Sequence, residues 1–227
     1  MTDALLNFLL PTNCAACGRA GKPLCDDCNE ALGLRSRQVN RGRLEGFAAC
    51  DYGQVAQQVI HSFKEGGQTC LATTMAGAMC ALVSDFELEA VLLVGLPSSR
   101  QNYKRRGYSP GWVLASKLAS RVRRNLARRK DGSLGHVAAA NGLRFIRAVE
   151  DQSLLSAADR AQNLIGSMRA SNWISGKSVI LVDDVVTTGS TLAEAHRATS
   201  EAGANVLGFV TFAESLLKMS TQNQKWV

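Results

Sequence analysis

This 227-residue sequence lacks the segments that mark membrane-spanning and secreted proteins. No apolar run approaches the ~20 residues that a membrane-spanning helix requires, so an integral membrane protein is not expected. The start of the chain, MTDALLNFLLP, has a short apolar run without a preceding basic segment or a small-residue cleavage site, which argues against a secretory signal. These absences make the cytoplasm the expected location.

Acidic residues are absent from one long segment of the chain. From Arg100 to Lys130 the sequence has eleven Lys and Arg residues and no Asp or Glu, whereas the remaining segments hold 15 basic and 19 acidic residues. The net charge of +7 is therefore a local patch, which single-stranded DNA would match as a polyanion. A solvated helix end is the simpler interpretation, because few aromatic residues (Tyr103, Tyr108 and Trp112) are available to stack on bases.

The seven cysteines are an odd number, which argues against a framework made only of disulfides. Four of them form two CxxC pairs around a short insert with Gly and Pro, a spacing that can place four thiolates around Zn²⁺. They are Cys14, Cys17, Cys25 and Cys28. Paired disulfides and CxxC redox chemistry are the alternatives. Four sulfur ligands leave the metal no open position, so we expect a structural zinc site whose removal unfolds the first ~40 residues and leaves the sheet domain folded.

The segment Val179–Thr191, VILVDDVVTTGST, organises the rest of the chain. Its apolar start is typical of a strand buried on both faces, and Asp183 and Asp184 come at the carboxyl end. A small hydroxyl-rich loop and a helix start follow, where backbone N–H groups and hydroxyls can bind a phosphate. The loop residues are Thr187, Thr188, Gly189, Ser190 and Thr191. The carboxylates suit ribose hydroxyls or a hydrated Mg²⁺; an ordinary capped strand–loop–helix turn is the alternative.

Two further segments place cations near a possible anion site. The strand expected at 91–96 is followed by Pro97, Ser98, Ser99 and Arg100, a polar loop of the kind that binds ligands in open α/β sheets. Residues 101–109 are predicted to form a mobile loop that closes over an anionic substrate, or else a plain solvated loop. This segment contains Lys104, Arg105 and Arg106. Lys64 could reach a phosphate or be a solvated lysine at a helix end, and the sequence favours neither.

The predicted fold is a Rossmann-like α/β domain with a central parallel sheet, preceded by the small four-cysteine module. Residues 1–46 are assigned to the module and a basic linker, and residues 47–227 to the main domain. Expected strands are 47–52, 91–96, 143–147, 179–182 and 206–212, and expected helices are 55–63, 69–86, 112–130, 156–163 and 192–202. Residues 131–142 are expected to be a loop of low order.

The central segment lacks the Gly-Lys-Ser/Thr of a Walker loop and the GxGxxG of a dinucleotide fingerprint, and it resembles the phosphoribosyl diphosphate (PRPP) signature of type I phosphoribosyltransferases. The wider order of motifs is similar to that of the ComF/GntX family. Besides the four cysteines, this order comprises DYGQ at 51–54, HSFK at 61–64, VGLPS at 94–98, RRGY at 105–108, QSLLS at 152–156 and RAQN at 160–163. Ser109-Pro110 stands where that family usually has Asn-Gln, and Glu65 where it usually has an aromatic residue.

The resemblance implies a type I phosphoribosyltransferase fold in which Asp183 and Asp184 hold the ribose, the loop 187–191 wraps the 5′-phosphate, and the loop 98–100 holds the diphosphate. It implies an enzyme that binds PRPP with Mg²⁺ and transfers phosphoribosyl to a nitrogen nucleophile. The candidate cations for the departing diphosphate are Arg100, Lys104, Arg105 and Arg106.

Some ComF/GntX members are linked to uptake of single-stranded DNA, so DNA-uptake proteins are possible partners. The alternative function is a non-catalytic protein that binds nucleotides or single-stranded DNA on the same fold. The sequence leaves the acceptor and the oligomeric state open, and its three histidines (His61, His136 and His196) lie in no constellation typical of a general base.

Overall fold

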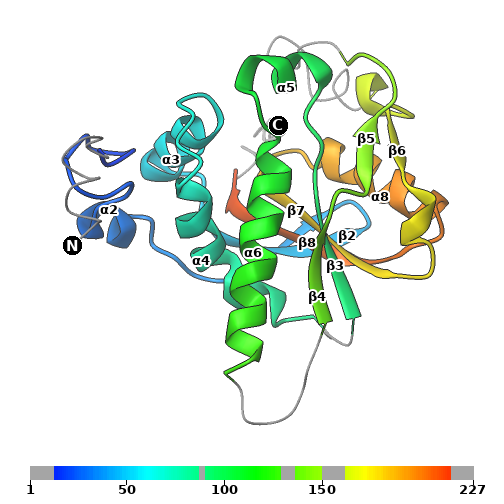
Figure 1. Cartoon of the computed structure of the whole chain (residues 1–227), viewed down its shortest axis with the longest axis horizontal. Coiled ribbons are helices and arrows are strands. Elements are labelled where there is room, and N and C mark those ends of the chain that lie inside the picture. Colours follow the sequence, from blue (N-terminus) through cyan, green and yellow to red (C-terminus); the bar gives the residue numbers. More distant parts are fainter. Residues whose placement is uncertain (1–12, 87–89, 129–135, 150–161, 216–227) are drawn as a thin grey trace, which may run out of the picture.

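A six-stranded sheet forms the centre of the molecule in a computed structural model that describes residues 13–86, 90–128, 136–149 and 162–215 (Figure 1). The strand order is β1-β2-β8-β7-β3-β4; β1 pairs antiparallel with β2, and all other neighbours are parallel. The strands are β1 (Arg37–Arg41), β2 (Leu44–Asp51), β3 (Ala90–Gly95), β4 (His136–Ala140), β7 (Ser178–Val186) and β8 (Asn205–Glu214). The predicted α/β fold with a central, mainly parallel sheet is confirmed.

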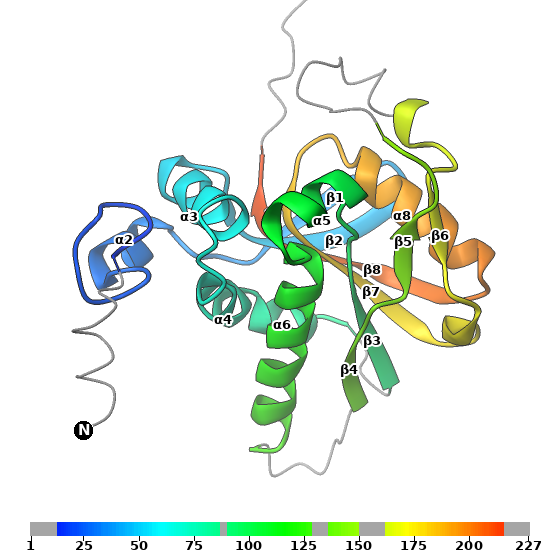
Figure 2. The same ribbon diagram turned by 45° about the horizontal axis from the view of Figure 1, so that its top comes forward.

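Helices cover both faces of this sheet (Figure 1, Figure 2). The helices α3 (Gln54–Lys64), α4 (Leu71–Val83) and α6 (Pro110–Leu126) pack on one face, and α8 (Ser190–Glu201) packs on the other. A small antiparallel pair lies on the α8 side, formed by β5 (Leu143–Phe145) and β6 (Met168–Ala170) and followed by the 3-10 turn η2 (Asn172–Ile174).

The central strand β7 shows why the sheet is covered on both sides. Its side chains alternate between two cores: Ile180 and Val182 join the core under α4 and α6, and Val179 and Leu181 join the core under α8. All four side chains are fully buried. A continuous apolar run is what a parallel strand requires when both faces are covered. The strand is longer than the predicted 179–182 and includes the acid pair.

Two glycines bring α6 against the end of β3. A Cβ atom at Gly95 would lie 2.1 Å from the carbonyl oxygen of Gly111, and a Cβ atom at Gly111 would lie 2.2 Å from the carbonyl oxygen of Leu96. A side chain at either position would therefore push the two backbones apart. This contact places the start of α6 directly beside the loop that leaves β3.

The amino-terminal module consists of α2 (Asp26–Ala31) and the loops before it, and it lies beside α3 at one end of the molecule (Figure 1). Its apolar side chains Leu24 and Leu32 belong to the same core as Cys50 of β2 and Ala56 of α3. The module is therefore packed onto the larger domain. The boundary at residue 46 stays a prediction.

The strand β1 lies inside the segment that was expected to be a linker. Its sequence, RQVNR, has one apolar residue, Val39, which is 1% exposed. Polar residues suit an edge strand, but a single buried side chain gives no detectable alternation along the sequence. The linker interpretation is therefore wrong for residues 37–41, which pair with β2.

The prediction of a mobile loop at 101–109 is also wrong, because most of this segment lies in the helix α5 (Arg100–Arg106). Ser99 caps the helix by accepting a hydrogen bond of 3.2 Å from the amide of Asn102, and Gly107 ends it with a φ of 77°. A helix of two turns without an apolar stripe leaves no periodicity in the sequence, so this helix was not predicted.

Residues 136–140, which were expected to belong to a loop, form β4 and pair in parallel with β3. Alanine-rich strands lack the β-branched residues that usually mark a strand, which explains the difference. The helix expected at 156–163 falls mostly outside the described residues; residues 162–164 are helical, and 168–170 form β6.

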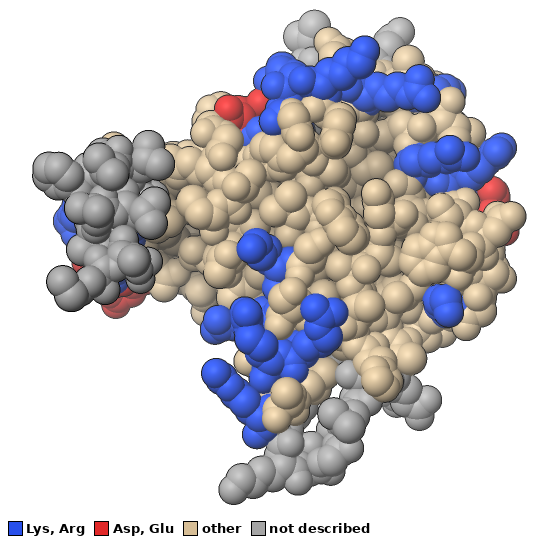
Figure 3. All heavy atoms as spheres, viewed as in Figure 1, with Lys and Arg blue, Asp and Glu red and all other residues tan. Residues whose placement is uncertain are grey.

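Lys and Arg side chains gather on the face that carries α6 (Figure 3). One group lies along α6, which bears four exposed cations, and another lies over α5. The exposed cations of α6 and of the residues just after it are Lys117, Arg121, Arg123, Arg124 and Arg128. None of the described helices has both the length and the apolarity that crossing a bilayer demands.

Candidate functional site

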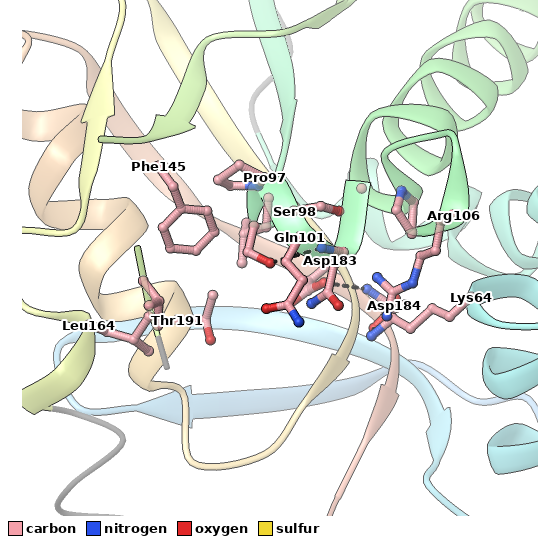
Figure 4. Close-up of a pocket in the computed structure, with 16 residues that line it drawn as sticks. Lys64, Pro97, Ser98, Gln101, Arg106, Phe145, Leu164, Asp183, Asp184 and Thr191 are labelled. Carbon is pink, nitrogen blue, oxygen red and sulfur yellow. Dashed lines mark hydrogen bonds and ion pairs between the residues drawn. The ribbon is translucent and has the colours of Figure 1, made fainter. Parts of the chain in front are cut away.

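A cavity of about 280 Å³ opens at the carboxyl ends of β3 and β7, with α5 and the end of α3 at its sides (Figure 4). It collects a large part of the predicted site from distant parts of the sequence, namely Lys64, Ser98, Ser99, Arg106, Asp183, Asp184 and Thr191. Seven other predicted residues do not line this cavity: Arg100, Lys104, Arg105, Thr187, Thr188, Gly189 and Ser190. The carboxyl edge of a parallel sheet is where open α/β folds bind ligands.

The acid pair lies near the end of β7 and contacts Lys64. Asp184 is 2% exposed, and its Oδ1 lies 2.8 Å from the Nζ of Lys64. Asp183 is half-buried, and its Oδ1 accepts a hydrogen bond of 2.9 Å from the Asp184 amide. Both interpretations of Lys64 from the sequence therefore need correction. Its ammonium is not solvated at a helix end, and it is not free to bind a phosphate, because it is paired with the buried carboxylate of Asp184.

These charges shift the proton affinities within the cluster. Burial opposes the charged form of Lys64, but the carboxylates of Asp184 and Asp183 outweigh it, so the pKa of Lys64 lies above its ordinary value. Burial, and then the neighbouring Asp184 carboxylate, raise the pKa of Asp183 to about 7, although Lys64 acts in the opposite direction. A carboxyl group with this pKa can accept or release a proton near neutral pH.

The loop after β7 leads into α8 through a left-handed glycine. Gly189 has a φ of 84° and is the N-cap residue of α8, and the hydroxyl oxygens of Thr188 and Ser190 lie 3.0 Å apart. Thr187 is exposed and the following four residues are half-buried, so the loop is accessible. Thr191 lines the cavity of the acid pair, whereas Thr188, Gly189 and Ser190 line a neighbouring hollow of about 370 Å³.

Glu65 engages two of the predicted cations. Its Oε2 lies 2.6 Å from Nη1 of Arg105, and its Oε1 lies 2.6 Å from Nη2 of Arg106. The hydrogen bond from Arg106 is the main reason that the pKa of Glu65 lies below its ordinary value. Arg106 is 12% exposed and lines the cavity, whereas Arg105 is 57% exposed and does not. An incoming anion therefore has to compete with Glu65 for both guanidinium groups.

One end of the cavity is apolar. Phe145, Val149 and Leu164 contribute to its lining, and Figure 4 shows Phe145 and Leu164 across the cavity from Lys64 and Arg106. Nothing in the sequence marks these residues as part of a site, because isolated apolar residues near a short strand are typical of an ordinary core. An aromatic wall facing a charged wall can accommodate a planar ring next to a phosphorylated sugar.

Arg41 of β1 contacts the loop after β7 and was also missed. Its Nε donates a hydrogen bond of 2.7 Å to the carbonyl oxygen of Thr187, and its Nη2 donates one of 2.8 Å to Glu214. Nothing in a basic, glycine-containing segment of the sequence signals a contact with a loop 146 residues away.

The four cysteines of the amino-terminal module come together. Their sulfur atoms all lie within 4.8 Å of one another, and those of Cys17 and Cys25 are 3.7 Å apart. Sulfurs arranged tetrahedrally at ~2.3 Å from Zn²⁺ are about 3.8 Å apart, so this cluster could hold a metal ion with little adjustment. Burial acts to raise the pKa of Cys14, but hydrogen bonds, first from the Cys25 amide, bring it down to about 6, which favours the thiolate.

Parts of this chain are similar in sequence to known proteins. Residues 108–226 match the phosphoribosyl transferase domain, which is more than half of the chain. The DNA utilization protein YhgH of Escherichia coli strain K12 is 26% identical over 197 residues, covering 80% of this chain and 81% of the relative. An adenine phosphoribosyltransferase of Mycolicibacterium gilvum is 51% identical over 41 residues, covering 18% of this chain and 23% of the relative.

Among solved structures, an adenine phosphoribosyltransferase from Rhodothermus marinus is 18% identical with a TM-score of 0.40, covering 84% of this chain and 88% of that chain. The YhgH relatives and the matched domain confirm the resemblance to the ComF/GntX family that the motif order indicates. The chain belongs to the phosphoribosyl transferase domain family.

Proposed function

We propose that this protein binds PRPP together with Mg²⁺ and transfers the phosphoribosyl group to a nitrogen nucleophile. The observation that carries the proposal is the cavity in which the acid pair of β7 meets the loop after β3 and the start of α8. A phosphorylated sugar needs acceptors for its hydroxyls close to donors for its phosphates, and these elements supply both at one edge of the sheet.

Each part of PRPP has a proposed position. The carboxylates of Asp183 and Asp184 accept hydrogen bonds from the ribose hydroxyls, with Asp183 the more accessible of the two. The N–H groups and hydroxyls of the loop 187–191 bind the 5′-phosphate at the start of α8. The diphosphate lies against the loop after β3, where Ser98 lines the cavity and the Ser99 hydroxyl, which accepts from Asn102, keeps its own proton to donate.

The donor set of the cavity suits Mg²⁺, which prefers oxygen ligands and keeps several waters. Asp183 offers a partly exposed carboxylate, whereas Asp184 is already paired with Lys64. Asp183 is therefore the residue proposed to hold the hydrated ion with PRPP. When bound, the ion supplies positive charge to the diphosphate.

The reaction breaks the bond between C1 of the ribose and the diphosphate oxygen and forms a bond from C1 to nitrogen. Diphosphate leaves with the electron pair, so the sugar passes through an oxocarbenium-like state and catalysis rests on positioning and charge. Arg106 lies in the cavity wall, where it can stabilise the departing charge once it exchanges Glu65 for diphosphate. None of the residues that the structure assigns to the cavity lining is a histidine.

The four-cysteine cluster is proposed to bind a structural zinc ion. Four sulfur ligands complete a tetrahedral shell and leave no position for a substrate. The cluster belongs to the module that packs beside α3, outside the cavity. Its proposed role is to hold the amino-terminal module in one conformation.

Calorimetric titration with PRPP and Mg²⁺ tests the main proposal. The unaltered protein binds PRPP in the presence of Mg²⁺, and the double variant Asp183→Asn/Asp184→Asn loses this binding while keeping its circular dichroism spectrum. The exposed residue Asp85 provides a matched control, because Asp85→Asn removes a charge from a residue that does not line the cavity. Unchanged affinity in the double variant contradicts the assignment of the site. A screen for diphosphate release across nitrogenous bases then identifies the acceptor.

A second candidate function is binding of single-stranded DNA without turnover, linked to DNA uptake. It is supported by the row of exposed cations on α6 and by the similarity to YhgH, which is named a DNA utilization protein. Contacts between these cations and phosphates would make the affinity fall steeply with salt. DNA-uptake proteins are the proposed partners in this case.

The triple variant Arg121→Gln/Arg124→Gln/Arg128→Gln separates the two functions. All three side chains are exposed and lie outside the cavity lining. If DNA binding is a function of this face, the salt dependence of single-stranded DNA binding, measured by fluorescence anisotropy, becomes shallower by about two to three phosphate contacts. PRPP affinity stays the same in this variant. DNA affinity and salt slope identical to those of the unaltered protein exclude this surface.

A further inference from the structure

We infer that Arg41, on the edge strand β1, is a positioning residue that holds the loop after β7 in its anion-binding conformation. The inference rests on the proposed function, because it assigns a device to the same phosphate loop. It starts from a contact that crosses the sheet: β1 is an edge strand separated from β7 by β2 and β8, yet the Arg41 side chain reaches the loop that leaves β7.

The guanidinium group of Arg41 joins the loop to the end of β8. Its Nε donates a hydrogen bond of 2.7 Å to the carbonyl oxygen of Thr187, and its Nη2 donates to Oε1 of Glu214 at 2.8 Å and to the carbonyl oxygen of Ser215 at 3.4 Å. The Arg41 side chain is 12% exposed and that of Glu214 is 8% exposed. Two nearly buried, oppositely charged groups therefore fix the direction in which the guanidinium points.

Fixing the Thr187 carbonyl also fixes the next N–H group. The peptide unit is planar and trans, so the N–H of Thr188 points opposite to the Thr187 carbonyl. With the carbonyl directed to Arg41, the Thr188 N–H is directed to the other side of the loop. The backbone N–H groups of this loop are the proposed ligands of the 5′-phosphate, so the contact sets the orientation of one of them before any ligand arrives.

The aliphatic part of Arg41 packs against the same loop. A Cβ atom at Gly189 would lie 2.6 Å from Cβ and 2.9 Å from Cγ of Arg41, so the arginine stem fills the space that a side chain would need. Gly189 also has a φ of 84°, which favours glycine. The head of Arg41 thus holds the start of the loop, and its stem packs against the residue that caps α8.

Arginine suits this position better than lysine. Its planar fork can donate to the Thr187 carbonyl and the Glu214 carboxylate at once, whereas a lysine ammonium has a different geometry and cannot span both acceptors in the same way. Glu214 is in turn near Arg37, at 3.9 Å, and Arg37 pairs with Asp51 at 2.9 Å. The contact of Arg41 with the loop is therefore part of a larger network of charged side chains at this edge of the sheet.

Three variants and a matched control test the inference. Arg41→Met removes the fork, Arg41→Lys keeps the charge, and Arg41→Met/Glu214→Gln also removes the buried carboxylate that would otherwise lose its partner. Arg43→Met is the control, because Arg43 is exposed and lies on the same hairpin, and its side chain makes no hydrogen bond or ion pair within the described part of the chain.

The first measurement is hydrogen exchange of the amides of Thr188, Gly189 and Ser190 in the ligand-free protein, resolved by NMR. We expect exchange roughly tenfold faster in Arg41→Met and in the double variant, an intermediate effect in Arg41→Lys, and no change in Arg43→Met. The second measurement is PRPP affinity with Mg²⁺, which falls roughly tenfold in the same two variants. Amides at β7 report whether the sheet stays intact.

Each outcome decides the inference. Unchanged exchange at the loop in any folded variant that lacks the fork overturns it, and so does faster exchange without loss of PRPP affinity. If the unaltered protein does not bind PRPP, the proposed function fails, and the exchange data still show whether Arg41 orders the loop. If Arg41→Met does not fold, the double variant and Arg41→Lys provide the answer.

Discussion

Asp183 is a residue whose charge is set by its place in the fold. Its carboxyl group has an ordinary pKa of 3.8, and burial followed by repulsion from Asp184 raises this pKa to about 7 in the folded protein. A carboxyl group that binds its proton more tightly in the folded state stabilises that state only while it is protonated. The contribution is fully present below pH 3.8 and is lost as the pH rises towards 7.

The variant Asp183→Asn should remove this part of the pH dependence. We expect the free energy of unfolding of the unaltered protein to fall between about pH 4 and pH 7 relative to that of the variant, by at most about 4 kcal/mol from ~1.4 kcal/mol per pKa unit. Denaturant unfolding at a series of pH values measures the free energy of unfolding of both proteins. The difference between the two curves isolates Asp183, because all other titrating groups are present in both proteins. Parallel curves for the two proteins contradict the raised pKa.

At the scale of single residues, the sequence indicates side chains with a recognisable chemistry but not those whose role depends on distant contacts. Asp183, Asp184, Ser98 and Thr191 stand in one motif or at one strand end, and the sheet brings them to one cavity. Arg41 has no such context in the sequence. Its contact exists because β1 folds back along the edge of the sheet, which the sequence does not indicate.

At the scale of elements, the carboxylate of one glutamate joins the end of α3 to α5. Glu65, at the end of α3, pairs with Arg105 and Arg106 of α5. If these guanidinium groups bind the diphosphate of PRPP, Glu65 is a competitor already in place. Removal of the Glu65 carboxylate should therefore increase the affinity for PRPP. If the carboxylate served only to hold α5 in place, its removal would instead weaken PRPP binding.

We expect Glu65→Gln to increase the affinity for PRPP and for inorganic diphosphate by several-fold, because a neutral amide competes less well for two cations. Glu45→Gln, an exposed change of the same kind on β2, is the control. Calorimetry with each ligand and Mg²⁺ measures the effect. Affinity that falls or stays constant in Glu65→Gln would show that the carboxylate supports the site instead of competing with its ligand.

The helices and strands differ in how clearly their hydrophobic pattern predicts them from the sequence. The strand β7 was predicted because four consecutive apolar residues, Val179 to Val182, reflect burial on both faces. In contrast, α5 has only seven residues and no apolar stripe, and its limits are set by the Ser99 cap and by Gly107. The strand β4 contains three alanines, a residue type that favours helices over strands. Local caps and tertiary pairing, instead of periodicity, determine such elements.

At the scale of the whole molecule, the amino-terminal module is attached to the sheet domain through a shared core. Leu24 and Leu32 pack with residues of β2 and α3, while the four sulfur atoms close the module on itself. The sheet domain has its own cores on both faces, so it does not need the module to bury its strands.

We expect purified protein to contain about one zinc ion per chain, and strong chelators to unfold the module while β7 and β8 remain protected. The pairing of β1 with β2 should stop the unfolding before residue 37. Metal analysis and hydrogen exchange followed by mass spectrometry measure both effects. Absence of zinc from protein purified under reducing conditions removes the metal assignment, and loss of protection throughout the sheet contradicts the independence of the two parts.

The arrangement around the acid pair has a consequence for the electrical balance of any binding event. Four charged side chains contribute to the cavity lining in the described structure, two positive and two negative: Lys64, Arg106, Asp183 and Asp184. Glu65 and Arg105 add one more of each sign alongside. Above the raised pKa of Asp183, where every carboxylate is ionised, the charges around the ligand-free cavity cancel. A strongly anionic ligand therefore gains no net electrostatic attraction from these side chains and has to bind together with its own counterions.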